Sequence, residues 1–521
     1  MMKFYKTITL ILTIALIFSA CLPSKSIARP VAGPDYWPTQ NWQSSSPEQQ
    51  GMDSAKLADM LEEINQNKTN IHSLLIIRNG YLITEVYFHP YTQDTKEHIQ
   101  SVTKSVIGML VGKAIGDGSI KSANEKLVSF YTNRTFSNTG AKKDSIRLKD
   151  LLSMSSGLDC QEFSGTGTTM EQSPDWVQFM LDLPVTTTPG QQFGYCNGNA
   201  HLLSAILEKT NHLNTRIYAN QEIFQPLGIP FVSESDWGAD PQGFSLGGFG
   251  LHLRPKDLAK LAFLYLHHGK WEDQQIIPAS WIAESTTQQT KKEDGSGYGY
   301  LWTVYPEDGH YAALGLGGQQ IHVYPQKDLI FIVTAGLPAF AEAPEIEKML
   351  GEFILPAIQS ENSLPENAAA FSRLQKAVEF AANPLQPIPS LPDVALNISQ
   401  QVYKFEENPV GWQTLKLDFK PGANTAQLIL NDSTPVQVGL DNLYRLSNTE
   451  LFVDLLIRGS WTDKTTFVID YPYAISGPIK LGELGATQIS IKYSEDAIQT
   501  TIQPLIFGGE PIVFNGVKIN N

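Results

Sequence analysis

The chain has 521 residues, too many for one ordinary domain core, and this length predicts two domains and a leader. Hydrophobic residues make up 42% and charged residues 17%, a balance typical of globular rather than disordered chains. The formal net charge is -15 at pH 7, which argues against nucleic acid as a partner because binding it requires a basic surface.

Residues 1–21 have the pattern of an export signal. Lys3 and Lys6 are followed by an apolar run that is too short to span a bilayer as a mature helix. Small residues then precede Cys21, and this resembles a bacterial lipobox, in which the cysteine is lipidated after cleavage. We therefore expect an exported, periplasmic protein that a lipid at Cys21 attaches to the membrane. Plain secretion after cleavage near Ala28 is the alternative.

Residues 22–46 are expected to be a tether, and residues 47–359 to form one domain in which helical and strand patterns mix. Helices are predicted over 53–65, 102–115, 148–154, 176–181, 201–210, 255–269, 278–285 and 345–359, and strands over 73–78, 81–88, 298–304, 319–324 and 329–334. Asn79-Gly80 is a strong hairpin signal between the first two strands. Strands from both ends must join one sheet, so the expected fold class is mixed α/β, with a mainly antiparallel sheet flanked by helices.

Residues 360–395 read as a linker with one amphipathic helix over 368–381 and a Pro-rich run after it. After this linker the sequence pattern changes to short strand-like runs separated by turn residues. These strands are predicted over 414–419, 426–430, 436–440, 466–471 and 488–493. Residues 396–521 are therefore expected to form a small all-β barrel or sandwich.

Ser101 and Lys104 lie three residues apart on a predicted helix and so share one face. A serine hydroxyl becomes a nucleophile when a neighbouring base takes its proton, and an amine can do this. Taken alone, the pair is equally typical of a helix N-cap followed by a solvated charge.

Two later segments carry further candidate groups. Tyr195 can exchange protons, and Asn197 can both donate and accept hydrogen bonds. Gly317, Gly318 and Gln319 open a predicted strand, where an accessible N–H could form half of an oxyanion hole. The alternative for Tyr195 and Asn197 is a turn before a helix, and the alternative for the glycine segment is a strand-edge bulge.

In this order and spacing the three motifs resemble the penicillin-recognising serine hydrolases: class C β-lactamases, D-alanyl-D-alanine peptidases, and their esterase and 6-aminohexanoate-dimer hydrolase relatives. The resemblance implies that Ser101 is acylated and that Lys104 and Tyr195 share the general base and acid work. Asn197 would be an accessory polar group, and Gly317, Gly318 and Gln319 would line the substrate site. It implies no metal and no cofactor.

One position departs from that pattern, because Leu316 stands where the family usually has Lys or His. That cation helps β-lactamases to bind the substrate carboxylate, so its loss favours a small ester or amide, or a peptide, as substrate. A true β-lactamase or D-amino-acid peptidase, and a sensor that binds or acylates without turnover, remain alternatives.

Cys160 and Cys196 flank motifs that should meet at one site. Export would place them in an oxidising compartment, so a disulfide is expected, with two buried free thiols as the alternative. The histidines have no metal-ligand spacing, and His201 is expected to pack on its helix. Asp159 and Glu162 are interpreted as structural or solvated groups.

Overall fold

The computed structural model describes residues 34–162, 165–337, 342–384, 386–447, 455–471, 487–504 and 510–519. The predicted leader with Cys21, and the first part of the predicted tether, lie outside the described residues.

The first domain is built on an eight-stranded antiparallel sheet with strand order β2-β1-β12-β11-β10-β9-β8-β7. Its strands are β1 (Ile71–Arg78), β2 (Tyr81–Tyr87), β7 (Thr290–Lys291), β8 (Gly297–Tyr298), β9 (Thr303–Tyr305), β10 (His310–Gly315), β11 (Gln319–Tyr324) and β12 (Leu329–Ala335). Strands β1 and β12 pair as the second and third strands of the sheet, so the first and last long strands of the domain's sequence lie side by side. The predicted mixed α/β class with an antiparallel sheet is confirmed.

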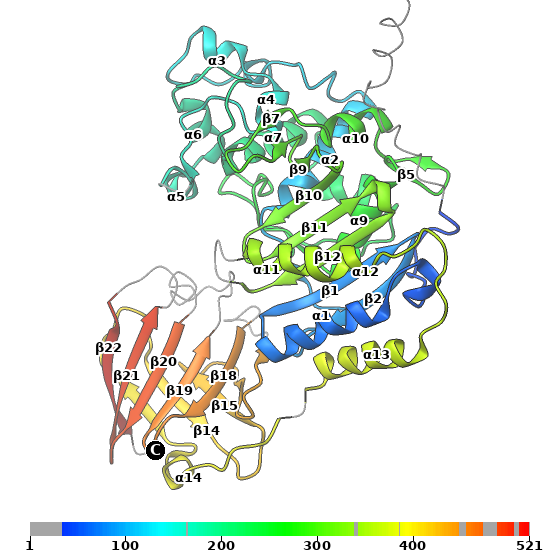
Figure 1. Cartoon of the computed structure of the whole chain (residues 1–521). Coiled ribbons are helices and arrows are strands. Elements are labelled where there is room, and N and C mark those ends of the chain that lie inside the picture. Colours follow the sequence, from blue (N-terminus) through cyan, green and yellow to red (C-terminus); the bar gives the residue numbers. More distant parts are fainter. Residues whose placement is uncertain are drawn as a thin grey trace, which may run out of the picture. The chain divides into compact units, whose positions relative to one another are not determined.

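Helices cover both faces of this sheet, which is why every residue of β1 and β12 is buried. On one face, α1 (Ser54–Asn67) and α13 (Ala368–Ala382) lie side by side (Figure 1). On the other face, α9 (Pro255–Leu266) packs on β1, β12 and β11, and α2 (Val102–Asp117) packs on β10 and β11. The other helices that build the region around α2 are α4 (Leu148–Leu152), α6 (Trp176–Asp182), α7 (Asn197–Asn211) and α10 (Ala279–Ser285).

Several predicted elements differ from those in the structure. The strand predicted over 298–304 is two short strands, β8 and β9, because the chain turns at Leu301, whose φ is 61°. Strand β10 was not predicted at all. The helix predicted over 345–359 is interrupted by a π-helical segment, Met349–Ile354. Helix α7 begins at Asn197, four residues before its predicted start, so Asn197 lies in its first turn.

Residues 34–46, expected to belong to the tether, contact the α/β domain. The Trp37 ring packs edge-on against Phe263, with centroids 5.8 Å apart. The Thr39 carbonyl accepts a hydrogen bond of 2.8 Å from Lys260 Nζ. The backbone N–H of Ser45 donates to the carbonyl of Leu82 on β2. Over these residues the chain is therefore held against the domain surface.

The C-terminal strands form a closed barrel, so of the two predicted alternatives the barrel is correct. They are β13 (Val402–Phe405), β14 (Thr414–Asp418), β15 (Thr425–Leu430), β16 (Val436–Gly439), β17 (Arg445–Ser447), β18 (Leu455–Trp461), β19 (Thr466–Tyr471), β20 (Thr487–Tyr493), β21 (Ala497–Pro504) and β22 (Ile512–Ile519). Neighbours are antiparallel, and a parallel contact between β16 and β18 closes a ring of nine strands, with β17 paired outside it. Burial alternates along β14 and β15, which places one face of each strand in an apolar core.

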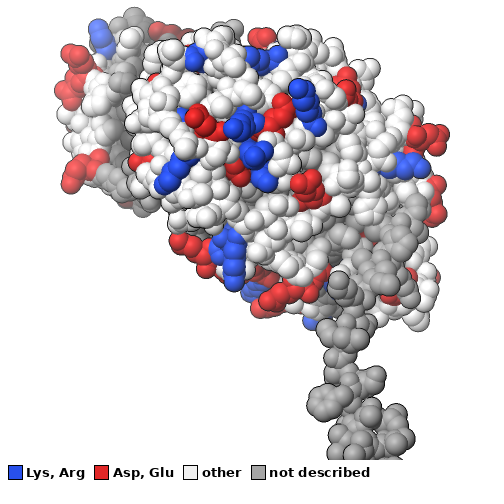
Figure 2. Space-filling model, turned by 90° about the horizontal axis from the view of Figure 1, so that it is seen from above, with Lys and Arg blue, Asp and Glu red and all other residues white. Residues whose placement is uncertain are grey.

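Among the described residues, no helix is long and apolar enough to cross a membrane. On the face shown in Figure 2, Lys and Arg side chains are interspersed with Asp and Glu instead of gathering into a basic stripe.

Candidate active site

Ser101 lies immediately before α2, but its side chain does not cap the helix. Its Oγ instead accepts two hydrogen bonds, from Lys104 Nζ at 3.0 Å and from the Tyr195 hydroxyl at 2.7 Å. The preceding residue, Gln100, has a φ of 51°, a left-handed conformation that costs a non-glycine residue about 1–2 kcal/mol. Strain of this kind is often found beside functional groups. Ser101 thus stands at the N-cap position of α2, but its hydroxyl bonds Lys104 and Tyr195 and makes no capping hydrogen bond.

The Lys104 side chain is 1% exposed, so it is not a solvated surface charge. Besides Ser101, its Nζ donates to the carbonyl of Gly248 at 2.6 Å. Nζ also lies 4.8 Å from the centre of the Tyr195 ring. Burying an ammonium group is costly unless it is hydrogen-bonded, and these contacts account for its burial.

Tyr195 enters the site from the loop before α7. The N–H of Gly194 donates to the carbonyl of Met154, which holds this loop against the segment after α4. Tyr298 on β8 lies close to Tyr195. Burial raises the pKa of Tyr298 well above its usual range, and negative charge on Tyr195 would raise it further. Tyr298 is thus a neutral neighbour of Tyr195, and sequence reasoning did not single it out.

Gly248 is a second group that sequence reasoning did not place in the site. A Cβ on Gly248 would lie 2.9 Å from the Cβ of Asn197, so only glycine allows this approach. The adjacent Gly247 is equally tight, because a Cβ there would lie 2.2 Å from the carbonyl oxygen of Ala200. The signal in the sequence was the Gly247-Gly248 pair, whose close packing brings the Gly248 carbonyl to Lys104.

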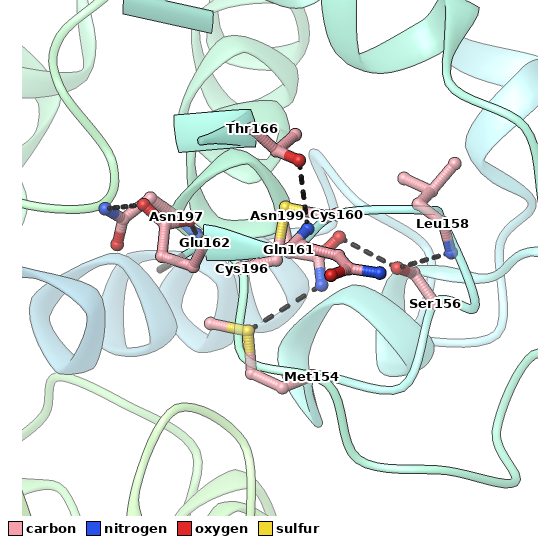
Figure 3. The surroundings of a disulfide bond; sticks show 10 residues. All are labelled: Met154, Ser156, Leu158, Cys160, Gln161, Glu162, Thr166, Cys196, Asn197 and Asn199. Carbon is pink, nitrogen blue, oxygen red and sulfur yellow. Dashed lines mark hydrogen bonds between the residues drawn. A yellow bond between two sulfur atoms is a disulfide. The ribbon is translucent and has the colours of Figure 1, made fainter. Parts of the chain in front are cut away.

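Asn197 lies in the first turn of α7 and binds Glu162 (Figure 3). Its backbone N–H and its side-chain Nδ2 each donate to the Glu162 carboxylate at 2.7 Å. A carboxylate near the N-terminus of a helix is favoured by the helix dipole. Glu162 is therefore a partner of a candidate site residue. The interpretation of Glu162 as a structural or solvated group did not include this contact with Asn197.

Cys160 and Cys196 are joined by a disulfide bond, with Cα atoms 5.8 Å apart. Figure 3 shows that the bond ties the loop carrying Glu162 to the start of α7. The spacing contained a usable signal, because Glu162 follows one cysteine by two residues and Asn197 directly follows the other. Both sulfurs are used by the disulfide and carry no thiolate, so this cluster with Glu162 is not a metal site.

The glycine segment forms the tight turn between β10 and β11, where Gly317 and Gly318 have φ values of 80° and 94°. The Gln319 side chain donates to the Ala335 carbonyl on β12 and so faces the sheet. At the other end of the turn, a Cβ on Gly315 would lie 2.7 Å from the Ile99 carbonyl oxygen, so this turn packs on the segment before Ser101. The oxyanion role of the Gln319 N–H stays a prediction.

His201, on the second turn of α7, is buried and bonds Asp240 at 2.9 Å. Burial by itself raises the pKa of Asp240, but the hydrogen bonds from His201 and from backbone N–H groups outweigh it and lower that pKa. Trp176 packs on the His201 ring. This agrees with the expectation that His201 packs on its helix.

The geometry thus places an amine and a phenol on one serine hydroxyl, the set needed to move a proton off that hydroxyl. A family model described as Beta-lactamase matches residues 57–347, more than half of the chain. The chain belongs to this family. The resemblance inferred from the motifs is confirmed, and the protein is a hydrolase of the β-lactamase fold.

Similar proteins come from a curated set and from solved structures. The 6-aminohexanoate-dimer hydrolase of Paenarthrobacter ureafaciens is 22% identical over 318 residues, covering 55% of this chain and 77% of that protein. The structure of EstCE1, described as a hydrolase with promiscuous acyltransferase activity, has a TM-score of 0.50 and 16% identity, covering 59% of this chain and 99% of that chain. At this identity the structural likeness shows the fold of the β-lactamase-family domain and nothing more.

Proposed function

We propose that this β-lactamase-family protein is a serine hydrolase that cleaves a small ester or amide through an acyl-enzyme on Ser101. The observation that carries the proposal is the convergence of Lys104 Nζ and the Tyr195 hydroxyl on Ser101 Oγ. One of these two groups takes the serine proton as Oγ attacks the substrate carbonyl, and the pair returns a proton to the leaving group.

The tetrahedral intermediate carries a negative oxygen that must be stabilised. In our proposal the backbone N–H groups of Ser101 and Gln319 hold it, an interaction worth about 2.7–4 kcal/mol for one donor. The packing of Gly315 against Ile99 supports this, since it brings the turn that carries Gln319 to the segment before Ser101. Water then hydrolyses the acyl-enzyme, with Lys104 and Tyr195 serving the second step.

Leu316 bears on the substrate. A β-lactam carries a carboxylate, and an apolar side chain at this position supplies no charge to bind it. We therefore favour an uncharged ester or amide, or a peptide, over a β-lactam. The relative named 6-aminohexanoate-dimer hydrolase, after an amide-linked dimer, supports an amide among the substrates.

The test is intact-protein mass spectrometry after treatment with a fluorophosphonate probe, followed by mapping of the labelled peptide. We expect one label, on Ser101, and none on the Ser101→Ala variant. Short-chain p-nitrophenyl esters should turn over in the wild type, and nitrocefin slowly or not at all. Labelling elsewhere would overturn the site assignment. A burst without turnover would favour a sensor, and rapid nitrocefin cleavage a β-lactamase.

We further propose that the protein is exported to the periplasm and lipid-anchored at Cys21. The Cys160–Cys196 disulfide supports an oxidising compartment. Membrane fractionation after metabolic labelling with a radioactive fatty acid should place label on the wild type and none on Cys21→Ala. Unlabelled, freely released wild-type protein would instead show plain secretion.

A further inference from the structure

Glu162 fixes which way the Asn197 amide faces. An ionised carboxylate only accepts hydrogen bonds, and it accepts from both the backbone N–H and Nδ2 of Asn197. The Asn197 carbonyl oxygen, Oδ1, must therefore point away from Glu162, as Figure 3 shows. The disulfide holds the two partners together, since it joins the residue before Asn197 to the loop that carries Glu162.

The Asn197 Oδ1 atom is buried and has no hydrogen-bond partner among the described residues. It lies beside Gly248, where an added Cβ would be 3.2 Å from it. The Gly248 carbonyl is the group that accepts from Lys104. A buried acceptor without a donor is unfavourable, so its retention beside the residue whose carbonyl binds Lys104 calls for a donor at some stage of the reaction.

Lys104 can supply that donor. As an ammonium group it has three N–H bonds, and two of them are used by Ser101 Oγ and the Gly248 carbonyl. When Ser101 is acylated, its Oγ bonds the acyl carbon and its proton leaves through the neighbouring base to the leaving group. Oγ is then an ester oxygen, a much poorer acceptor, and Lys104 loses a partner.

We propose that Glu162 is a positioning residue: it holds Asn197 Oδ1 toward Lys104 so that the amine keeps an acceptor in the acyl-enzyme. This inference rests on the proposed function of Ser101. It assigns Glu162 to the second half of the reaction, the hydrolysis of the acyl-enzyme.

The first test compares two substitutions of Glu162 with p-nitrophenyl butyrate as substrate. Glu162→Gln is isosteric but can both donate and accept, so it permits the Asn197 amide to flip. Glu162→Asp keeps an acceptor-only group. We expect Glu162→Gln to lower kcat about tenfold with a change of less than about threefold in kcat/KM, which reports acylation. Glu162→Asp should recover most of kcat, and Asp159→Asn on the same loop should leave both unchanged.

The second test exchanges donor and acceptor. Asn197→Asp alone places two carboxylates together and should also lower kcat. In the double variant Glu162→Gln with Asn197→Asp, the introduced glutamine can accept from the backbone N–H and donate to the new carboxylate, whose second oxygen faces Lys104. The double variant should therefore exceed the better single variant in kcat, a coupling that independent effects cannot produce.

Two results would overturn the inference: equal losses in Glu162→Gln and Glu162→Asp, or additive losses in the double variant. Both would mean that Glu162 matters only for folding, which thermal unfolding of each variant measures separately. Failure of the proposed function looks different, because wild-type turnover would then be absent or would persist in Ser101→Ala.

Discussion

The barrel and the α/β domain differ in the polar groups that they bury. In the described part of the barrel, the buried polar side chains are Thr500 and Asp441, and Arg445 pairs with Asp441 at 2.6 Å. The α/β domain buries whole lysines, a His–Asp pair and many hydroxyls. Burying charged groups lowers the free energy of unfolding, so the α/β domain is where we expect buried groups to be kept for a reaction at the expense of stability.

Within the α/β domain, the partners of each buried lysine separate structure from chemistry. Lys143 and Lys260 donate to backbone carbonyls, which cannot exchange a proton with an amine. Lys104 donates to one carbonyl and also to the Ser101 hydroxyl. A hydroxyl can exchange a proton with an amine. The hydrogen-bond partners of a buried lysine are thus a better indicator of function than its burial alone.

The largest expected effect comes from removing the amine at Ser101. Lys104→Met should lower kcat by about 10²–10⁴-fold, the usual contribution of a general acid or base, with little loss of thermal stability. Lys260→Met is the matched control, because it also removes a buried, carbonyl-bound lysine. It should lower the melting temperature and leave kcat of the folded protein within about twofold. Ester hydrolysis and calorimetry on both variants make the comparison, and similar kcat losses in both would erase the distinction.

A smaller effect is expected from crowding the Gly248 carbonyl. In Gly248→Ala the new Cβ would lie 2.9 Å from Asn197, so the carbonyl must shift off Lys104. A displacement of this kind should cost about tenfold or more in kcat. Gly238→Ala is the control, since its nearest neighbour would be 3.6 Å away and its φ is not left-handed. Equal kcat values for Gly248→Ala and Gly238→Ala in steady-state kinetics would contradict the role of Gly248.

Breaking the disulfide should have a milder effect on kcat. Replacing Cys160 and Cys196 by Ser releases the loop that carries Glu162, so we expect kcat to fall about threefold to tenfold. Stability should fall by about 2–4 kcal/mol, as for other disulfides. Dithiothreitol should lower kcat of the wild type toward that of the double variant and leave the variant itself unchanged. An unaffected wild type would show that this link does not position the site.

The sequence predicted the sheet and the helix after Ser101 from local signals such as Asn79-Gly80 and the helical pattern of residues 102–115. It predicted the disulfide from the motifs that flank the two cysteines and from the expected export. It could not predict the Asn197–Glu162 contact or the approach of Gly248 to Lys104. These contacts join segments 35 and 144 residues apart, and only the packed chain defines them. Strand β10 was missed because His310 to Gly315 lacks the β-branched residues that mark a strand.

The smallest expected effect concerns a carboxyl in the α/β domain that has one oxygen without a hydrogen-bond partner, and it sharpens the contrast with the barrel. Asp328, in the turn between β11 and β12, has one buried oxygen with no hydrogen-bond partner among the described residues. Burial raises the pKa of Asp328 to about 6, although the charge of Arg78 opposes this. The unfolded value is about 3.9, so the folded state binds the extra proton between about pH 4 and 6. Stability must therefore fall as the pH rises through that window.

Asp328→Asn removes this penalty, and Asn tolerates the left-handed φ of 45° at this position. We expect the variant to be more stable than the wild type by about 1–2 kcal/mol at pH 7.5, a gain that shrinks to nothing near pH 4. Asp441→Asn in the barrel should do the opposite at neutral pH, because it leaves Arg445 without its partner. Calorimetry at pH 4, 5, 6 and 7.5 measures both differences. If the Asp328→Asn and wild-type profiles run parallel across pH 4 to 6, the charge on Asp328 carries no cost, and the two domains do not differ in this respect.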